Sequence, residues 1–292
     1  MKGKDPKELI ARVTDIPPLP AVATRVMGLA DSDRTSAPEL ASVLSADQGL
    51  TAQLIRVSNS AYFGAGRQVG SVREAVVLLG FRQVRQLAVG ASIMNNLKRP
   101  HTQPDGFDID LFWGHSVAVA IAADAVARAT HTAKPEDAFT AGIVHDIGRL
   151  VLRHAMPIEF REAVAMAAAG SVSLHDAELE VTGYCHEELG QALGEQWRFP
   201  AHLVEAIGRH HEQGLTVAND GLPALLALAN ELAHSYGLLC GYEIHDAPSV
   251  AIPQHLEAFE REVGGMDRLL ERAFGFIEGA SGAPNRWFAQ AS

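Results

Sequence analysis

Residues 136–152 read EDAFTAGIVHDIGRLVL, which is apolar nearly all round except for the adjacent pair His145-Asp146. Such a stretch predicts one continuous helix buried in the core. A polar pair inside that helix costs several kcal/mol unless both side chains are bonded. Bound metal would satisfy both, because imidazole and carboxylate are ligands for Zn, Fe or Mn. The pair therefore indicates either a buried hydrogen-bonded couple or a metal centre whose other ligands come from other helices.

Further candidate ligands lie on other predicted helices. His115 lies at the opening of one helix, His186 begins another, and His210 and His211 end a third. Any one of them can be an ordinary histidine, and the eight remaining histidines of the chain are interpreted as surface or filler residues. The ordered set of a histidine, a His-Asp pair, a histidine and a His-His pair is harder to ascribe to chance. The predicted metal ligands are His115, His145, Asp146, His186, His210 and His211.

The first hundred residues predict a separate lobe of about five short helices. Capping boxes begin at Ser36 and Ser71, Asp47 is a good N-cap, and Gly80 ends a helix. No period-two strand pattern stands out in this lobe, and we expect the whole fold to be all-α. Residues 1–100 carry a net charge of +5 and residues 101–292 a net charge of −16. The asymmetry favours two lobes with different surfaces, although chance drift in surface charge would give the same numbers.

The stretch RVSNSAYFG, residues 56–64, stands out between two predicted helices of this lobe. Asn59 and Ser60 at a helix end can bond the last carbonyls and turn the chain. Alternatively, they form a docking surface for a protein partner together with Arg56. Both interpretations are open from the sequence.

Composition limits the classes of function. The net charge of −11 argues against direct nucleic-acid binding. We find no apolar run of the roughly 18–20 residues that a membrane span needs, and no secretory signal. The two cysteines, Cys185 and Cys240, have no metal-type spacing and cannot make a disulfide scaffold. A cytoplasmic protein without a membrane partner is the expectation.

Several motifs in order resemble the HDOD family, the HD-related output domains of bacterial signalling, which are a divergent branch of the HD and HD-GYP metal-dependent phosphohydrolases. The likeness covers roughly residues 14–235. Its motifs are Leu19-Pro20, Ser45-Ala46-Asp47, Asn59-Ser60-Ala61, Trp113-Gly114-His115 and His145-Asp146-Ile147-Gly148. The resemblance implies an all-α fold with an N-terminal helical lobe over residues 1–100 and an HD-like bundle over residues 101–242. Beyond the likeness, the apolar stripes of residues 243–292 predict a helical extension with a frayed tail, which either packs on the bundle or forms a partner or homodimer surface.

The resemblance also implies a use for the predicted ligands. One divalent ion would be held by His115, His145 and Asp146, and a second by His186, His210 and His211 with Asp146 bridging. Arg149 and Arg209 are the candidate phosphate contacts.

Two departures from the hydrolase pattern favour a site without turnover. The late metal-binding aspartate falls at Asn230, and the Gly-Tyr-Pro signature after the His-His pair is absent. We therefore expect a regulatory module, response-regulator-like, which contacts a signalling protein and holds a metal ion or a nucleotide. The alternative is a metal-dependent phosphodiesterase that acts on a cyclic dinucleotide or another phosphodiester with His115, His145 and Asp146.

Overall fold

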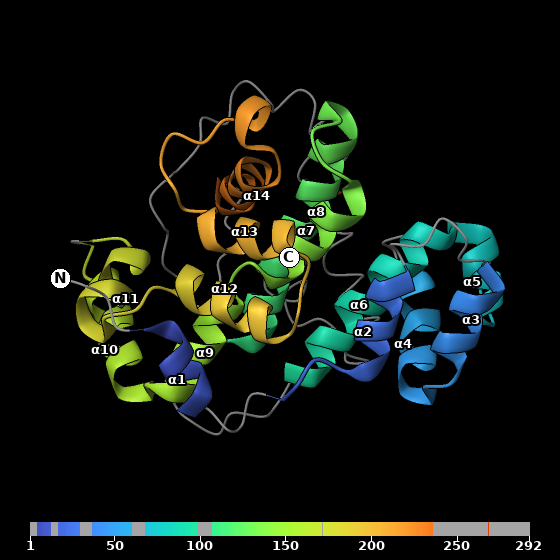
Figure 1. Ribbon diagram of the computed structural model, residues 1–292, viewed down its shortest axis with the longest axis horizontal. Coiled ribbons are helices and arrows are strands. Elements are labelled where there is room, and N and C mark those ends of the chain that lie inside the picture. The colour runs from blue at the N-terminus through green and yellow to red at the C-terminus, as the bar shows by residue number, and fades with distance from the viewer. Residues whose placement is uncertain are drawn as a thin grey trace, which may run out of the picture. The chain divides into compact units, whose positions relative to one another are not determined.

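The computed structural model describes residues 5–12, 17–29, 37–59, 68–97, 107–170 and 172–235, together with residue 268. Over these residues every element is helical and there is no strand, which confirms the all-α prediction (Figure 1). The helices fall into two compact units, and each unit is described by itself.

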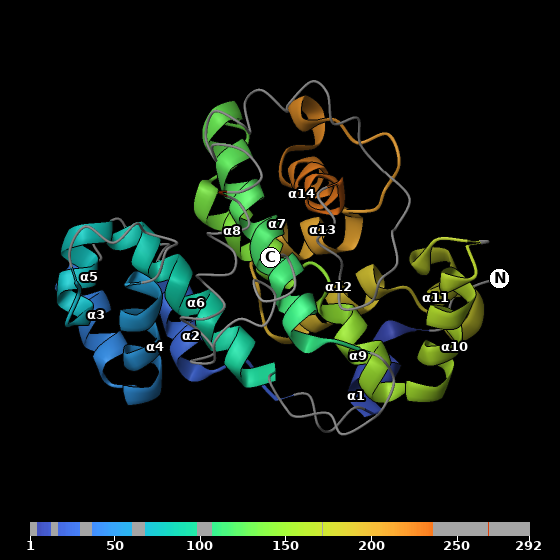
Figure 2. The ribbon, with the colours of Figure 1, turned by 180° about the vertical axis from the view of Figure 1, so that it is seen from behind.

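The first unit, called the lobe below, is built around its longest helix. It contains α2 (Ala21–Gly28), α3 (Ala37–Ser45), α4 (Gln48–Ser58), α5 (Val72–Leu79) and α6 (Phe81–Leu97). Helix α6 packs against α2, α3, α4 and α5 (Figure 2). The caps of α4 and α5 are as predicted: Asp47 accepts a hydrogen bond from the Leu50 amide at 2.9 Å, and Ser71 accepts one from the Glu74 amide at 3.2 Å. Gly80 ends α5 with a φ of 88°, whereas the cap predicted at Ser36 lies outside the described residues.

Asn59 has a defined structural role in this lobe. Its side-chain amide donates to the Val69 carbonyl at 2.8 Å, and its Oδ1 accepts from the Val69 amide at 2.7 Å. These two bonds tie the end of α4 to Val69, which precedes α5. Arg56 is exposed, and Ser60 lies outside the described residues. The docking role of this segment stays a prediction.

The second unit, called the bundle, surrounds α7. Its helices are α1 (Pro6–Arg12), α7 (Ile109–Thr130), α8 (Pro135–Val144), α9 (Ile147–Ala155), α10 (Pro157–Ala168), α11 (Leu174–Thr182), α12 (His186–Gln196), α13 (Ala201–Arg209) and α14 (Val217–Ser235). Helix α7 packs against α8 and α14, and α12 packs against α9 and α13 (Figure 1). Among the described residues, α7 is the one helix long and apolar enough to cross a membrane, but 83% of its most apolar window is buried within the protein. Those properties are the ones expected of a bundle's core helix.

The first helix of the chain corrects one detail of the predicted division. Helix α1 packs on α12 and α9, so it belongs to the bundle rather than to a lobe of residues 1–100. The predicted extension over residues 243–292 lies outside the described residues except for residue 268.

The prediction of one helix through residues 136–152 was wrong, because the chain turns at the His-Asp pair. Helix α8 ends at Val144 and α9 begins at Ile147. The break falls at Asp146, whose φ of −92° and ψ of 8° lie outside the helical range, whereas His145 still has helical angles. Both side chains are therefore presented by a turn between two buried helices.

Two glycines bring helix backbones into direct contact around this turn. A Cβ on Gly148 would overlap the carbonyl oxygen of His186, and one on Gly142 would overlap the backbone of Ala120. Only residues without a side chain allow α9 to approach the start of α12, and α8 to approach α7, this closely. The glycines thus place the helices that carry His115, His145 and His186 side by side.

Candidate metal centre

Asp146 stands between two pairs of histidines. Its Oδ2 lies 3.5 Å from Nε2 of His145 and 3.7 Å from Nε2 of His115. Its Oδ1 lies 3.2 Å from Nε2 of His186 and 3.7 Å from Nε2 of His210. Each carboxylate oxygen therefore faces its own pair of imidazoles, which is the arrangement of a bridging ligand.

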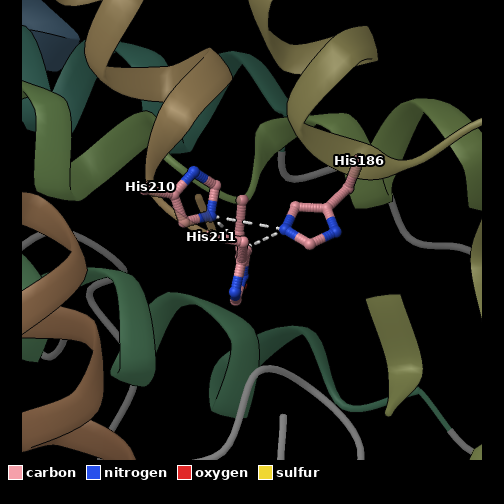
Figure 3. Close-up of side chains that lie close together, drawn as sticks. His186, His210 and His211 are labelled. Atoms are coloured by element: carbon pink, nitrogen blue, oxygen red, sulfur yellow. Dashed lines mark hydrogen bonds and ion pairs between the residues drawn. The ribbon is translucent and has the colours of Figure 1, made fainter. Parts of the chain in front are cut away.

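The ligands come from four separate parts of the bundle. His115 belongs to α7, the His145-Asp146 turn joins α8 to α9, and His186 is the first residue of α12. His210 and His211 follow the last residue of α13, and Figure 3 shows them beside His186. The structure brings all six predicted ligands together in two groups of donor atoms, each within 4.8 Å: His115, His145 and Asp146, and Asp146, His186, His210 and His211.

Hydrogen bonds at Nδ1 fix the direction of three of these rings. Nδ1 of His145 lies 2.8 Å from the Gly142 carbonyl oxygen, and Nδ1 of His210 lies 2.7 Å from that of Ile207. Since a carbonyl only accepts, both Nδ1 atoms carry the proton. Nδ1 of His186 lies 2.6 Å from Oε2 of Glu178, a carboxylate acceptor. Outer partners of this kind are typical of metal-bound histidines, because they leave Nε2 free to coordinate.

The inward-facing nitrogens provide a test of whether a metal fits. Nε2 of His186 lies 3.3 Å from Nε2 of His210, and Nε2 of His115 lies 3.2 Å from Nε2 of His145 (Figure 3 for the first pair). Nδ1 of His186 and Nδ1 of His210 both face acceptors, so in the neutral rings two lone pairs face each other across the gap between these histidines. A proton or a cation between them removes the repulsion. The residues present fit a divalent ion on either side of Asp146, and their nitrogen and oxygen donors suit Zn, Fe or Mn.

The protonation states agree with this fit at His145 and Asp146, whereas Glu178 and Glu187 raise the pKa of His186 despite its burial, so a metal there would have to displace a proton. Burial lowers the pKa of His145 to about 3, so its ring is neutral at physiological pH. Burial alone would raise the pKa of Asp146, but Arg149 and the neighbouring histidines hold it well below its usual value. A neutral imidazole beside an ionised carboxylate is the state in which both groups can bind a metal.

The two arginines predicted to contact phosphate are both engaged with carboxylates. Arg149 is 1% exposed, and its Nη1 donates to Oδ2 of Asp146 at 2.6 Å while its Nε donates to Glu178 at 3.1 Å. Arg209 pairs with Glu205 at 2.7 Å and Glu212 at 2.6 Å. Phosphate binding by either arginine would need these pairs to break, and it stays a prediction.

Two residues of the centre were not identified from the sequence. Glu178 of α11 is fully buried and accepts hydrogen bonds from both His186 and Arg149. His234 of α14, which was interpreted as surface or filler, is buried with its ring 4.7 Å from that of His115. The signal for His234 was its spacing, because it follows Asn230 by one helical turn. For Glu178 the sequence offers no comparable signal.

Asn230, the residue predicted to stand where hydrolases have their late aspartate, is buried in α14. It is 1% exposed, and its Oδ1 accepts no hydrogen bond from the described residues. An amide supplies no charge to the site, so the negative charge beside the two histidine pairs comes from Asp146 and the carboxylates behind it.

Comparison with known proteins identifies relatives of the whole fold. The model of the HDOD domain matches residues 16–213. A Treponema pallidum (strain Nichols) protein named "Uncharacterized protein" is 24% identical over 204 residues, which are 68% of this chain and 38% of the relative. This chain thus spans well under half of that relative's length.

Solved structures agree with this match. An HDOD domain protein with unknown function from Geobacter sulfurreducens is 26% identical with a TM-score of 0.74, over 94% of this chain and 95% of that one. A Shewanella amazonensis SB2B protein, provisionally named a phosphohydrolase, is 24% identical with a TM-score of 0.71, over 92% and 97% of the two chains. A Marinobacter aquaeolei VT8 protein, provisionally named a signal transduction protein, is 24% identical with a TM-score of 0.73, over 93% and 64%. The last two likenesses show a shared fold.

Proposed function

Because this chain belongs to the HDOD domain family, we propose that it is a regulatory signalling module that holds a divalent metal and acts through protein contacts without phosphodiester turnover. The observation that carries this proposal is the burial of the centre. His115, His145, His186 and His210 are 0% exposed and Asp146 is 1% exposed. Hydrolysis requires a phosphoryl oxygen and a water to reach the metal. Five of the six ligands are buried this deeply and His211 is partly exposed, an arrangement that suits an ion that holds the bundle together.

The metal would link parts of the bundle that are far apart in the sequence. A bound divalent ion supplies positive charge and Lewis acidity. Asp146 would balance that charge on both sides, while His115 and His145 hold one side and His186 and His210 the other. Binding at these positions would join α7, the α8–α9 turn, α12 and the end of α13. Occupancy would then set the arrangement of these helices, which a protein partner can recognise.

Two features support the absence of turnover. Asn230 leaves the site without the late carboxylate, and Arg149 donates to the oxygen of Asp146 that faces His115 and His145. The guanidinium thus adds positive charge beside His115, His145 and Asp146, the three residues that the hydrolytic alternative would use. The second candidate function, metal-dependent hydrolysis of a phosphodiester, is favoured by the complete set of bridging ligands. It would need the buried centre to open.

The partner is proposed to be a signalling protein met in the cytoplasm, with a nucleotide or a second copy of the chain as the other candidates. A pull-down from the native host, repeated with Arg56→Ala, addresses the lobe segment predicted to dock, because Arg56 is exposed whereas Asn59 makes the two bonds to Val69. Loss of one captured protein in that variant, with the metal content unchanged, supports docking through the lobe. Capture of the same protein by both forms argues against it.

The metal claim is tested by elemental analysis of protein purified without an affinity tag. We expect one or two equivalents of Fe, Mn or Zn in the natural protein and a marked loss in His145→Ala. His154→Ala is the matched control, because His154 lies on α9 outside the centre. Less than about a tenth of an equivalent in the natural protein would contradict a metal centre.

Turnover is tested separately on the metal-loaded protein. Cyclic di-GMP and a model phosphodiester are incubated with the natural chain and with His145→Ala, with Mn²⁺ or Fe²⁺ present. We expect the two proteins to give the same background rate. Hydrolysis that is present in the natural chain and absent from the variant would replace the regulatory proposal with the phosphodiesterase.

A further inference from the structure

A second cluster of metal-binding side chains lies next to the buried centre but uses none of its six ligands. His175 of α11, Cys185 and Glu187 offer one donor atom each, and these atoms all lie within 4.8 Å of one another. Nε2 of His175 is 2.9 Å from Oε1 of Glu187. Cys185 and Glu187 flank His186, so one turn of chain supplies both clusters.

The environment of the cluster differs from that of the buried centre. Cys185 and Glu187 are buried, at 8% and 5% exposed, whereas 29% of the His175 side chain is open to solvent. Oε2 of Glu187 is buried without a hydrogen bond from the described residues, although Nδ1 of His186 lies 3.4 Å away. The cluster therefore reaches the surface at His175, beside a buried thiol and a buried carboxylate.

Carboxylates contact both ring nitrogens of His175. Nε2 lies 2.9 Å from Oε1 of Glu187, and Nδ1 lies 3.4 Å from Oδ1 of Asp176. A metal held by the cluster would displace the proton of the Cys185 thiol and any proton on the coordinating nitrogen of His175, since only the deprotonated groups coordinate.

We propose that His175, Cys185 and Glu187 form a separate, solvent-accessible metal site for a sulfur-accepting divalent ion such as Zn²⁺. Thiolate, imidazole and carboxylate are all zinc ligands, and three protein ligands leave a fourth position for water. The proposal stands independently of the function of the buried centre, because it rests on different ligands. Spacing in the sequence gave no sign of it, since the fold brings His175 to Cys185 from another helix.

Cobalt titration distinguishes this site from the buried centre. The metal-free protein is titrated with Co²⁺, and the thiolate-to-cobalt charge-transfer absorption is followed in the near ultraviolet. The buried centre has no sulfur ligand and cannot give this band. We expect a saturable band that is lost in Cys185→Ser, weakened in Glu187→Gln, and retained in Cys240→Ser, which removes the other cysteine of the chain.

Two results would overturn the proposal: a natural protein that binds Co²⁺ without this band, or a band that persists in Cys185→Ser. Neither result touches the buried centre, whose share of the bound metal is measured by the loss that elemental analysis finds in His145→Ala. If Cys185→Ser does not fold, X-ray absorption on the zinc-loaded natural protein decides. A sulfur neighbour at about 2.3 Å from zinc is expected, and a zinc environment of nitrogen and oxygen only would contradict the site.

Discussion

The lobe and the bundle differ in the polar groups that they bury. In the described part of the lobe these are all neutral, namely Gln53, Ser58, Gln86 and Ser92. The bundle buries ionised and ionisable groups, including His115, His145, Asp146, Arg149, Glu178, His186, Glu187 and His210. Apolar burial depends weakly on pH and on ions, whereas buried charges depend on both. We infer that the lobe derives its stability from packing and caps, and that the bundle's stability is linked to protons and metal.

A fall in pH should produce the largest difference in stability between the two units. Because burial lowers the pKa of His145 to about 3 in the folded state, its contribution is present above the unfolded pKa of about 6.5 and is lost as pH falls from there towards 3. Asp146, whose pKa is also depressed, loses its contribution at still lower pH. Hydrogen exchange followed by segment between pH 8 and pH 4 should show early loss of protection in α8 and α9, which flank His145, with α6 unchanged. Equal loss in both units would refute the comparison.

Removal of the bridging charge is the largest expected effect of a single substitution. Asp146→Asn keeps the shape of the side chain but leaves Arg149 and the histidines without their shared carboxylate. We expect a loss of about 3–5 kcal/mol in the unfolding free energy of the bundle, as for a broken buried ion pair, together with loss of metal. Urea denaturation and elemental analysis measure the two effects. The control Asp124→Asn removes a carboxylate of α7 whose partner Arg128 is partly exposed, and it should cost far less; an equal cost would sink the idea that the centre is special.

Disturbing a backbone contact between two helices should lower stability by a smaller amount, and a glycine of the lobe provides the control. Gly148→Ala places a methyl group against the His186 carbonyl, which should cost about 1–3 kcal/mol and weaken metal binding. Gly28→Ala, near the end of α2, meets no atom within 4 Å and should be neutral or slightly stabilising. Thermal melts and metal content compare the pair. A harmless Gly148→Ala would show that α9 and α12 can move apart.

The smallest effect is expected in the lobe. Asn59→Ala removes two hydrogen bonds to Val69 and should cost about 1–2 kcal/mol of lobe stability. Segment-resolved hydrogen exchange should show the change in α4 and α5 only, and the metal content should equal that of the natural protein. Metal loss in this variant would show that the two units are coupled.

The all-α class and much of the site could be predicted from the sequence, because helix caps and histidine spacing are local signals. Asp47 and Ser71 cap their helices as expected, and the ordered histidines do meet at Asp146. The break at Asp146 could not be predicted, because an apolar stretch reads the same whether it forms one buried helix or two. Helix α1 was assigned to the wrong unit, and Glu178 was not identified as part of the site. The roles of both come from contacts with distant helices.

Arg149 bears on how an ion of the proposed metal centre would leave it. Its guanidinium is a tethered counter-ion, held on the same carboxylate that a metal would use. When an ion departs, Asp146 keeps a positive neighbour, and the empty bundle avoids a bare buried anion. If the buried centre opens for long enough to pass an ion, release and rebinding would leave the chain folded, and the occupancy of the centre would follow the supply of metal around it.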